Sequence, residues 1–398
     1  MKRPTERSES LKREIRRRDF VRLSAMAVGG AALGGCGGGT GTGPGTPDPE
    51  VPVEPTASVA AARGTDLYSM TRDVLERVGG IDSVVHAGET VLIKPNMVTL
   101  PWASNGDVFH NGECTKPEIL IATAEECLRV GAAEVVIGDG SQAAAFDWEE
   151  ATTLDGSTNL VAEAQRLSSE YAGTCRVACL EVHSPEWDEV PSRTHLGTIA
   201  TSSLVTRADR VITVPVAKTH CWAQLTLGLK NFVGVTSLAR YAGGTNDRGV
   251  TLDHSSTLSI ADIYLDVVRA VQPDLSIIDF SIGLEADGPT TGHGGRTVDM
   301  RNRLGSWLLL ASTDVVAADA MAALVMSHEP HLITQLYTAR SLGLGEYRPD
   351  RIELMGANLS DLQVPWSPAV LRNRISACPF SAQYFTARRH GSRSGTAV

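Results

Sequence analysis

Ionisable and amide side chains follow several short apolar runs that lie far apart in the sequence. The runs 90–93, 134–138 and 210–214 each predict a buried strand. The polar residues just beyond these runs are, in chain order, Lys94, Asn96, Asp139, Lys218, Thr219 and His220. Ligands of open parallel sheets bind outside the carboxyl ends of the strands. We therefore expect these side chains to converge on one ligand-binding crevice.

The lysines and asparagines in this set indicate an anionic ligand. Lys94, Lys218 and Lys230, together with Asn96 and Asn231, suit a carboxylate or a phosphate. The alternative is that each lysine packs its stem at a strand end and keeps its ammonium in water. Because the lysines occur in an otherwise acidic chain, we favour the first interpretation for Lys94 and Lys218.

His220 is the candidate acid–base group, since histidine titrates near neutral pH, and it is also a possible metal ligand. The alternative is a capping or partly buried histidine. We assign His220, Lys218 and Lys94 to the catalytic set. The substrate-binding set comprises Asn96, Asp139, Thr219, Lys230, Asn231 and His254.

A glycine-rich segment, 283–295, carries two carboxylates and a histidine. Together with Asp279, the carboxylates of Glu285 and Asp287 could hold a hard cation such as Mg²⁺. The alternative is a solvent-exposed turn. The sequence contains no dinucleotide fingerprint, P-loop, serine-hydrolase elbow or H-E-x-x-H motif, so no motif identifies a cofactor.

The elements that must position these residues alternate between strands and helices. Two further strands are expected at 275–278 and 308–311, and the polar residues after them, Asp279 and then Ser312, Thr313 and Asp314, are expected to join the same crevice. Helices are expected from Thr115 to Gly131 and over 259–271 and 314–326. This alternation predicts an α/β fold, a mainly parallel sheet with helices on both faces. The stretch 154–207 is less regular and predicts an insertion or small subdomain.

The composition limits the partners. The chain has 398 residues and a formal net charge of −10, which disfavours nucleic acid because phosphates need many basic contacts. Seven cysteines are present without a C-x-x-C run, so no iron–sulfur cluster is expected. Cys175 and Cys179 are the pair closest in sequence, and they could form a disulfide; the alternative is that both remain free thiols.

The N-terminus predicts export. Arg17 and Arg18 match a twin-arginine signal, a short apolar run follows, and Cys36 ends a lipobox-like sequence. A cleaved signal without lipid and a buried helix with a chance cysteine are the alternatives. We expect a signal over 1–36, a flexible tether over 37–62, the α/β domain over 63–378 and a basic disordered tail over 379–398.

This arrangement predicts a location at the cell envelope. The twin-arginine translocase would act as a partner during export, and a lipid on Cys36 would anchor the mature protein to a membrane. The twin-arginine route carries folded proteins, often with a cofactor already bound, which favours a bound group such as a divalent metal.

Several segments together resemble the bacterial and archaeal domain of unknown function 362, over about residues 88–327. They are 91–96, 115–118, 136–139, 218–220, 227–235, 279–285, 288–289 and 311–319. The resemblance implies an α/β domain and little settled biochemistry. Some relatives carry ferredoxin-type cysteine clusters, which this chain lacks. A more distant analogy, at the level of the fold alone, links it to nickel-pincer lactate racemases, which bind carboxylates with Lys and His.

Two functions therefore compete. The first is an enzyme that binds a small anionic substrate with its lysines, moves a proton with His220 and holds a divalent metal in the acidic loop. The second is a tethered solute-binding lipoprotein that uses the same crevice without chemistry. A purely structural lipoprotein ranks third, because it gives no reason for so many ionisable groups at strand ends.

Overall fold

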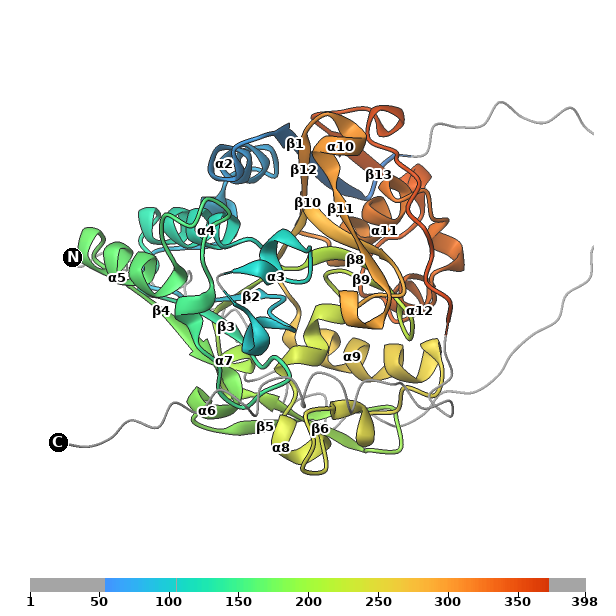
Figure 1. Cartoon of the computed structure of the whole chain (residues 1–398), viewed down its shortest axis with the longest axis horizontal. Helices are drawn as coiled ribbons and strands as arrows, with labels where there is room; N and C mark the ends of the chain where they lie inside the picture. The colour runs from blue at the N-terminus through green and yellow to red at the C-terminus, as the bar shows by residue number, and fades with distance from the viewer. Residues whose placement is uncertain (1–53, 105, 372–398) are drawn as a thin grey trace, which may run out of the picture.

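The structure, a computed structural model, describes residues 54–104 and 106–371 and is built around one large mixed sheet (Figure 1). The main strands run in the spatial order β13–β1–β12–β10–β7–β2–β3–β4. Their bounds, in the same order, are Ile352–Met355, Ala57–Gly64, Trp307–Ser312, Leu275–Ala286, Arg210–Val214, Thr90–Pro95, Glu134–Asp139 and Thr174–Cys179.

The strands that precede the predicted site residues are parallel to one another. β10, β7, β2, β3 and β4 form a continuous parallel series, with Ile93 of β2 opposite Ile137 of β3 and Ile212 of β7. Their carboxyl ends therefore lie along one edge. The fold is a mainly parallel mixed sheet of the α/β class, as the alternation of elements predicts.

One predicted strand runs the other way. β12 is antiparallel to both β10 and β1, with Ile277 opposite Ala311. The end of β12 therefore points to the opposite edge of the sheet, and the expectation that 312–314 joins the crevice is wrong. Asp314 instead caps the next helix by accepting hydrogen bonds from the backbone N–H groups of Val316 and Ala317.

A short branch extends the sheet beyond β7. After Pro215 the chain continues as β8 (Val216–His220), which pairs with the far half of β10 and with β9 (Gln224–Thr226). β11 (Gly295–Asp299) pairs with the same part of β10. β10 is 12 residues long, and its length lets it support both the main sheet and this branch.

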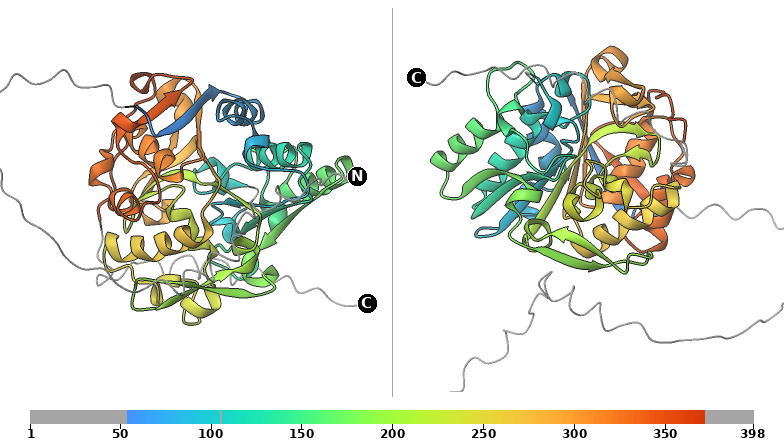
Figure 2. Two further views of the ribbon diagram at one scale, coloured as in Figure 1. Left: turned by 180° about the vertical axis from the view of Figure 1, so that it is seen from behind. Right: turned by 60° about the horizontal axis from the view of Figure 1, so that its bottom comes forward.

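Helices cover both faces of the sheet, as Figures 1 and 2 show. One face carries α2 (Leu67–Arg77), α4 (Pro117–Arg129) and α5 (Leu160–Glu170). The other carries α9 (Thr257–Val271), α11 (Val315–Val325) and α12 (Thr334–Ser341). The shorter helices are α3 (Asp107–His110), α6 (Leu180–His183), α7 (Ser203–Thr206), α8 (Leu238–Tyr241) and α10 (Met300–Leu304).

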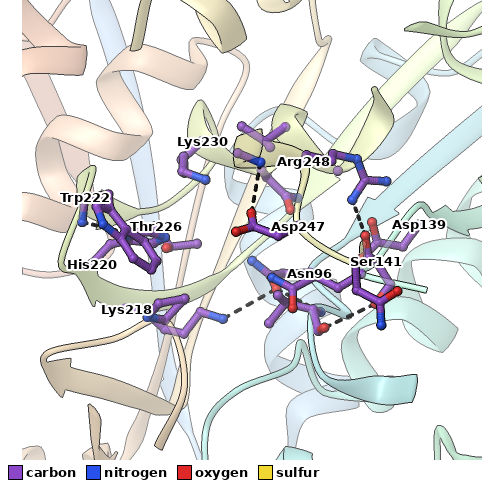
Figure 3. Close-up of a pocket in the computed structure, with 18 of the residues that line it drawn as sticks. Asn96, Asp139, Ser141, Lys218, His220, Trp222, Thr226, Lys230, Asp247 and Arg248 are labelled. Atoms are coloured by element: carbon purple, nitrogen blue, oxygen red, sulfur yellow. Dashed lines mark hydrogen bonds between the residues drawn. The ribbon is translucent and has the colours of Figure 1, made fainter. Parts of the chain in front are cut away.

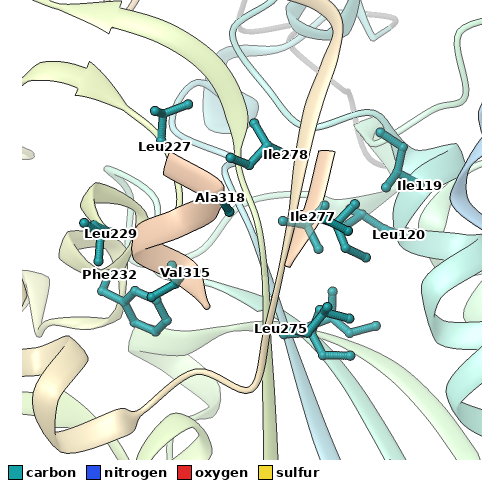
Figure 4. Close-up of a cluster of buried hydrophobic side chains, with 14 of the residues drawn as sticks. Ile119, Leu120, Leu227, Leu229, Phe232, Leu275, Ile277, Ile278, Val315 and Ala318 are labelled. Carbon is teal, nitrogen blue, oxygen red and sulfur yellow. The ribbon is translucent and has the colours of Figure 1, made fainter. Parts of the chain in front are cut away.

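The core lies on both sides of β10, as expected for a strand with continuous apolar sequence. Leu275 and Ile277 point toward Ile119 and Leu120 of α4, whereas Ile278 points toward Ala318 of α11 (Figure 4). Each of these side chains is buried. Two-sided burial fixes the register of β10 and, through it, the position of the branch.

Two segment boundaries in the structure differ from the predicted ones. Residues 57–62 were expected in the tether, but they belong to β1, whose Val59, Ala60, Ala61 and Ala62 are buried in the sheet between β12 and β13. The stretch 154–207 contributes β4 to the main sheet and adds a separate hairpin of β5 (Trp187–Pro191) and β6 (Thr198–Ser202). Within the described ranges no helix is long and apolar enough to cross a membrane.

Candidate functional site

A pocket of about 440 Å³ opens at the carboxyl ends of the parallel strands. Its walls come from the ends of β2 and β3, from β8, from the 3-10 helix Lys230–Val235 and from the loop 245–254 (Figure 3). Trp102 and Trp222 supply apolar surface. A concave hollow on which polar groups from several segments converge, with aromatic surface beside them, is a typical small-molecule site.

The structure brings eight of the predicted catalytic and substrate-binding residues to this pocket. They are Lys94, Asn96, Asp139, Lys218, His220, Lys230, Asn231 and His254. Thr219 is the exception: it does not line the pocket, and its hydroxyl donates to the carbonyl of Ala286 at 2.6 Å. Alternation along β8 explains this, because residues on either side of Thr219 point to the opposite face.

Lys94 is fully paired. Its Nζ lies 2.7 Å from Oδ1 of Asp139, 2.6 Å from the carbonyl oxygen of Pro95 and 3.2 Å from Oδ1 of Asn231. Burial lowers the pKa of Lys94, and the Asp139 carboxylate counteracts part of that shift. With three acceptors for three protons, Lys94 has no donor left for a substrate, so its predicted catalytic role is replaced by a structural one.

Lys218 is buried without a carboxylate partner. Its Nζ donates to the carbonyl oxygen of Glu113 at 2.7 Å and lies 3.4 Å from Oδ1 of Asn96. The carboxylate of Glu113 is directed elsewhere and accepts from Thr291. Burial lowers the pKa of Lys218 to about 8. This amine therefore titrates close to neutral pH.

Lys230 and Arg248 add two more positive charges. Lys230 has no hydrogen-bond or carboxylate partner within the described part of the chain, and burial with the charge of Lys218 lowers its pKa to about 8. Among the described residues, Arg248 donates to carbonyl oxygens, those of Gly140, Ser141 and Thr236. The lining holds more cationic than anionic groups: its two carboxylates are Asp139, which pairs with Lys94, and the exposed Asp247 near Arg248.

The ring of His220 is held as a hydrogen-bond donor. Its Nδ1 accepts from the backbone N–H groups of Trp222 at 3.1 Å and Ala223 at 3.3 Å. The proton of the neutral ring therefore sits on Nε2. Burial and the nearby charge of Lys230 lower the pKa of His220 well below its usual value. A neutral imidazole of this kind polarises a carbonyl or stabilises an oxyanion rather than accepting a proton, which revises its predicted role.

His254 has the opposite tautomer. Its Nδ1 is 2.7 Å from the carbonyl oxygen of Leu252, to which it donates, so Nε2 carries the lone pair of the neutral ring. The indole of Trp222 packs edge-on against His254 and His293 and is tilted against His220. In this tautomer His254 presents a hydrogen-bond acceptor at Nε2, and His293, whose Nδ1 lies 2.9 Å from the hydroxyl of Thr290, is the third histidine of the lining.

The predicted metal ligands do not assemble. Asp279 is fully buried and forms an ion pair with Lys116, whose Nζ lies 3.3 Å from Oδ2. Its other oxygen accepts from the hydroxyl and backbone N–H of Ser281. Asp279 is thus a satisfied structural carboxylate, because its partners occupy both oxygens.

Glu285 and Asp287 hold the last described segment of the chain. Glu285 pairs with Arg303 at 2.9 Å and Arg296 at 3.2 Å, and it accepts from the backbone N–H of Ser367. Asp287 accepts from the backbone N–H of Val370 at 2.8 Å. Across residues 54–104 and 106–371, no group of three or more His, Cys, Asp or Glu side chains is arranged to hold a metal ion.

The order and spacing of these elements match one protein family. The model of the domain of unknown function DUF362 matches residues 91–324, more than half of the chain. The chain belongs to the DUF362 family. Every residue that lines the pocket falls inside the matched range, so the pocket is part of the DUF362 domain itself.

Comparisons with individual proteins give weaker likenesses. The chain is 28% identical over 283 residues to a thylakoid-associated protein of Synechocystis sp., covering 70% of this chain and 75% of that protein. The lactate racemase apoprotein of Thermoanaerobacterium thermosaccharolyticum is 10% identical, with a TM-score of 0.32, over 69% of this chain and 58% of that one. A Thermotoga maritima protein gives 10% identity and a TM-score of 0.39, over 66% and 60%. This DUF362 chain spans about three fifths of both solved structures.

Two glycines let the walls of the DUF362 pocket approach closely. The backbone N–H of Gly140 donates to the carbonyl of Gly234 at 3.0 Å. A Cβ on Gly140 would lie 2.2 Å from that oxygen, and one on Gly234 would lie 2.8 Å from Oδ1 of Asp139. No side chain larger than hydrogen fits at these positions.

Other residues of the site were given no role from the sequence. Arg248 and His293 lie in short 3-10 helices and Trp222 lies in the turn after β8, so tertiary contacts place them at the pocket. Lys116 was treated as part of a helix start, although it is buried beside Asp279. Its position two residues after a cysteine and before a proline carries no recognisable signal.

Cys175 and Cys179 do not form a disulfide. Cys175 and Cys179 lie in the same strand, β4, and both are free and buried. Residues i and i+4 of an extended strand are too far apart for a disulfide. The other described cysteines, Cys114, Cys127 and Cys221, are buried and form no disulfide either.

Proposed function

We propose that this protein is an exported enzyme that binds a small anionic substrate, a carboxylate or a phosphate, in the DUF362 pocket. The observation that carries the proposal is a pocket in an acidic chain that is lined by Lys218, Lys230 and Arg248, none of which forms an ion pair among the described residues. Buried charges are normally paired, so an anionic ligand is the natural partner. The low polarity of the surroundings would strengthen that interaction.

The histidines favour catalysis over simple binding. His220 offers a proton donor at Nε2 and His254 offers a proton acceptor at Nε2, and both rings line one cavity with Trp222 between them. A pair of groups set to opposite tasks by their surroundings is typical of acid–base enzymes. A non-catalytic solute-binding lipoprotein would need the cations but not this arrangement.

Ligand binding tests the proposal directly. Phosphate, acetate, lactate and pyruvate should each be titrated into the purified protein at low ionic strength, with binding followed by calorimetry and thermal shift. Lys230→Gln should weaken the tightest of these by roughly 10–100-fold, because a charge-assisted hydrogen bond contributes about 1.5–3 kcal/mol. Arg129→Gln is the matched control, since it removes the same charge from an exposed surface pair with Glu126.

Two results decide between the alternatives. If no anion in this set binds, or if Lys230→Gln and Arg129→Gln behave alike, the anion site is wrong. If an anion binds tightly but no product forms from metabolite mixtures analysed by mass spectrometry, the solute-binding alternative replaces the enzyme.

Export and anchoring are part of the same proposal and concern residues outside the described ranges. Arg17 and Arg18 would direct the chain to the twin-arginine translocase, and a lipid on Cys36 would hold it at the cell envelope. Replacing both arginines with lysine should retain the protein in the cytoplasmic fraction. Cys36→Ser should abolish incorporation of labelled fatty acid while export continues; labelling that persists in this variant would exclude the lipobox.

A further inference from the structure

Lysine is rare in this chain and occupies unusual positions. The sequence holds 30 arginines and only six lysines, which are Lys2, Lys12, Lys94, Lys116, Lys218 and Lys230. The four lysines in the described residues lie at or beside the pocket, three of them fully buried, whereas the exposed basic residues there are arginines. Unlike arginine, a buried lysine can lose its proton, so lysine is suited to places where a neutral amine is useful.

The three fully buried lysines differ in how many acceptors they have. Lys94 has three, including the Asp139 carboxylate. Lys116 also has three, namely Asp279 and the carbonyl oxygens of Cys114 and Ile282. Lys218 has two neutral acceptors. Three acceptors satisfy an ammonium group, whereas two satisfy a neutral amine and leave its lone pair for the cavity that Lys218 lines.

We propose that Lys218 is an amine nucleophile that forms an imine with the carbonyl carbon of a small 2-oxo acid. This inference rests on the proposed anion site and names its substrate class. The carboxylate would pair with Lys230, which places the adjacent carbonyl near Lys218, since both amines point into one cavity (Figure 3). The His220 Nε2–H would donate to the carbonyl oxygen.

Formation of the imine at Lys218 needs no external reagent. The Nζ lone pair forms the C–N bond as the carbonyl π electrons move to oxygen, giving a carbinolamine. The two amine protons end on that oxygen, one of them carried by His254, and the C–O bond breaks to release water. The product is a C=N bond between Lys218 and the substrate, which withdraws electrons from the neighbouring carbon.

The surroundings of Lys218 support a neutral amine. The ionisable groups whose charge acts on it are Glu113, Cys114, Lys116, Asp139, His220 and Lys230. Burial outweighs the nearby acidic groups and brings the pKa of Lys218 to about 8. At pH 7 this gives roughly 300 times the neutral fraction of a lysine with an ordinary pKa of 10.5.

Borohydride trapping tests the inference on the full chain. The protein is incubated with pyruvate, 2-oxoglutarate or phenylpyruvate, reduced with cyanoborohydride and mapped by peptide mass spectrometry. We expect a saturable secondary-amine adduct on Lys218, with labelling that rises as the pH passes through about 8. Lys94 and Lys116 serve as internal controls that stay unlabelled, because their amines are paired.

Lys218→Met supplies the matched variant, since its unbranched side chain fills similar space and needs no acceptor; circular dichroism checks its fold. It should lose the adduct while keeping detectable anion binding. Equal labelling at other lysines, or no adduct with all three acids, overturns the inference. Pyruvate binding without an adduct overturns the imine alone, whereas absence of anion binding overturns the proposed function as well.

Discussion

The ammonium of Lys94 lies 2.7 Å from the carboxylate of Asp139, and both side chains are almost wholly buried. The pair joins the ends of β2 and β3, and Asp139 also accepts from the backbone N–H groups of Met97 and Gly140. The ion pair and these two hydrogen bonds therefore hold together the pocket wall that the ends of β2 and β3 form. The pair stabilises the fold only while both side chains are present, because either one alone would be a buried charge without a counter-charge.

Removing one partner of this pair should destabilise the fold strongly. We expect Lys94→Met to lower the free energy of unfolding by about 3–5 kcal/mol, because the buried Asp139 carboxylate would lose its counter-charge. Urea denaturation followed by fluorescence measures this. Adding Asp139→Asn should restore part of the loss. Arg77→Met, which breaks an exposed pair with Asp73, should cost less than about 1 kcal/mol; equal losses would contradict the assignment.

Asp319 makes stability depend on pH. This fully buried carboxyl on α11 accepts from the backbone N–H groups of Gly228 and Leu229, just before Lys230. Burial raises its pKa to about 7. The folded state then holds a proton that the unfolded state releases, so this contribution is present at low pH and is lost as the pH rises from about 4 through 7.

Asp319→Asn isolates that contribution. Between pH about 4 and about 7, the free energy of unfolding of the wild type should fall by a few kcal/mol relative to that of Asp319→Asn. Denaturation of both proteins at a series of pH values measures this. A difference that does not vary with pH would show that Asp319 does not titrate there.

The close approach at Gly140 predicts a steric effect. Gly140→Ala places a methyl group 2.2 Å from the carbonyl oxygen of Gly234 and 2.9 Å from Nη2 of Arg248. We expect a loss of about 1–3 kcal/mol and weaker anion binding, because backbone must move at the pocket wall. Gly64→Ala meets only the flexible side chain of Met70 and is the control. Unchanged binding in Gly140→Ala would count against a rigid pocket.

Glu285 should act in stability and not in metal binding. Glu285→Gln weakens the pairs with Arg296 and Arg303 that hold residues 365–370 on the sheet. A lower melting temperature with unchanged metal content, measured by elemental analysis, is expected. Because these arginines keep the pKa of Glu285 below its usual value, its stabilising effect should be fully present above the ordinary carboxyl range and fade as the pH falls through and below that range. Loss of a bound metal in this variant would revive the predicted ligand set.

The strand pattern was a good guide to the site, for a physical reason. Apolar runs such as 91–93 and 134–138 become parallel strands, and parallel strands present their carboxyl ends at one edge. Lys94, Asp139 and Lys218 therefore meet although they are far apart in sequence. The same reasoning failed for 312–314, since a run of apolar residues does not reveal the direction of its strand.

The state of each ionisable group depended on contacts that no local pattern records. Nothing in the sequence distinguishes Lys94, which is paired with Asp139, from Lys218, which has no carboxylate partner. The tautomers of His220 and His254 follow from which backbone groups reach Nδ1. Arg248 enters the pocket through a loop, where hydrophobic periodicity has no meaning.

By itself, the sequence determined the α/β class, the family and the edge of the sheet where most of the ionisable residues gather, because apolar runs and the polar residues that end them are local properties of the sequence. Only the tertiary structure decided which charges are neutralised and which remain open to a ligand. Those outcomes depend on partners brought from distant segments and on burial, and both arise only when the chain has folded.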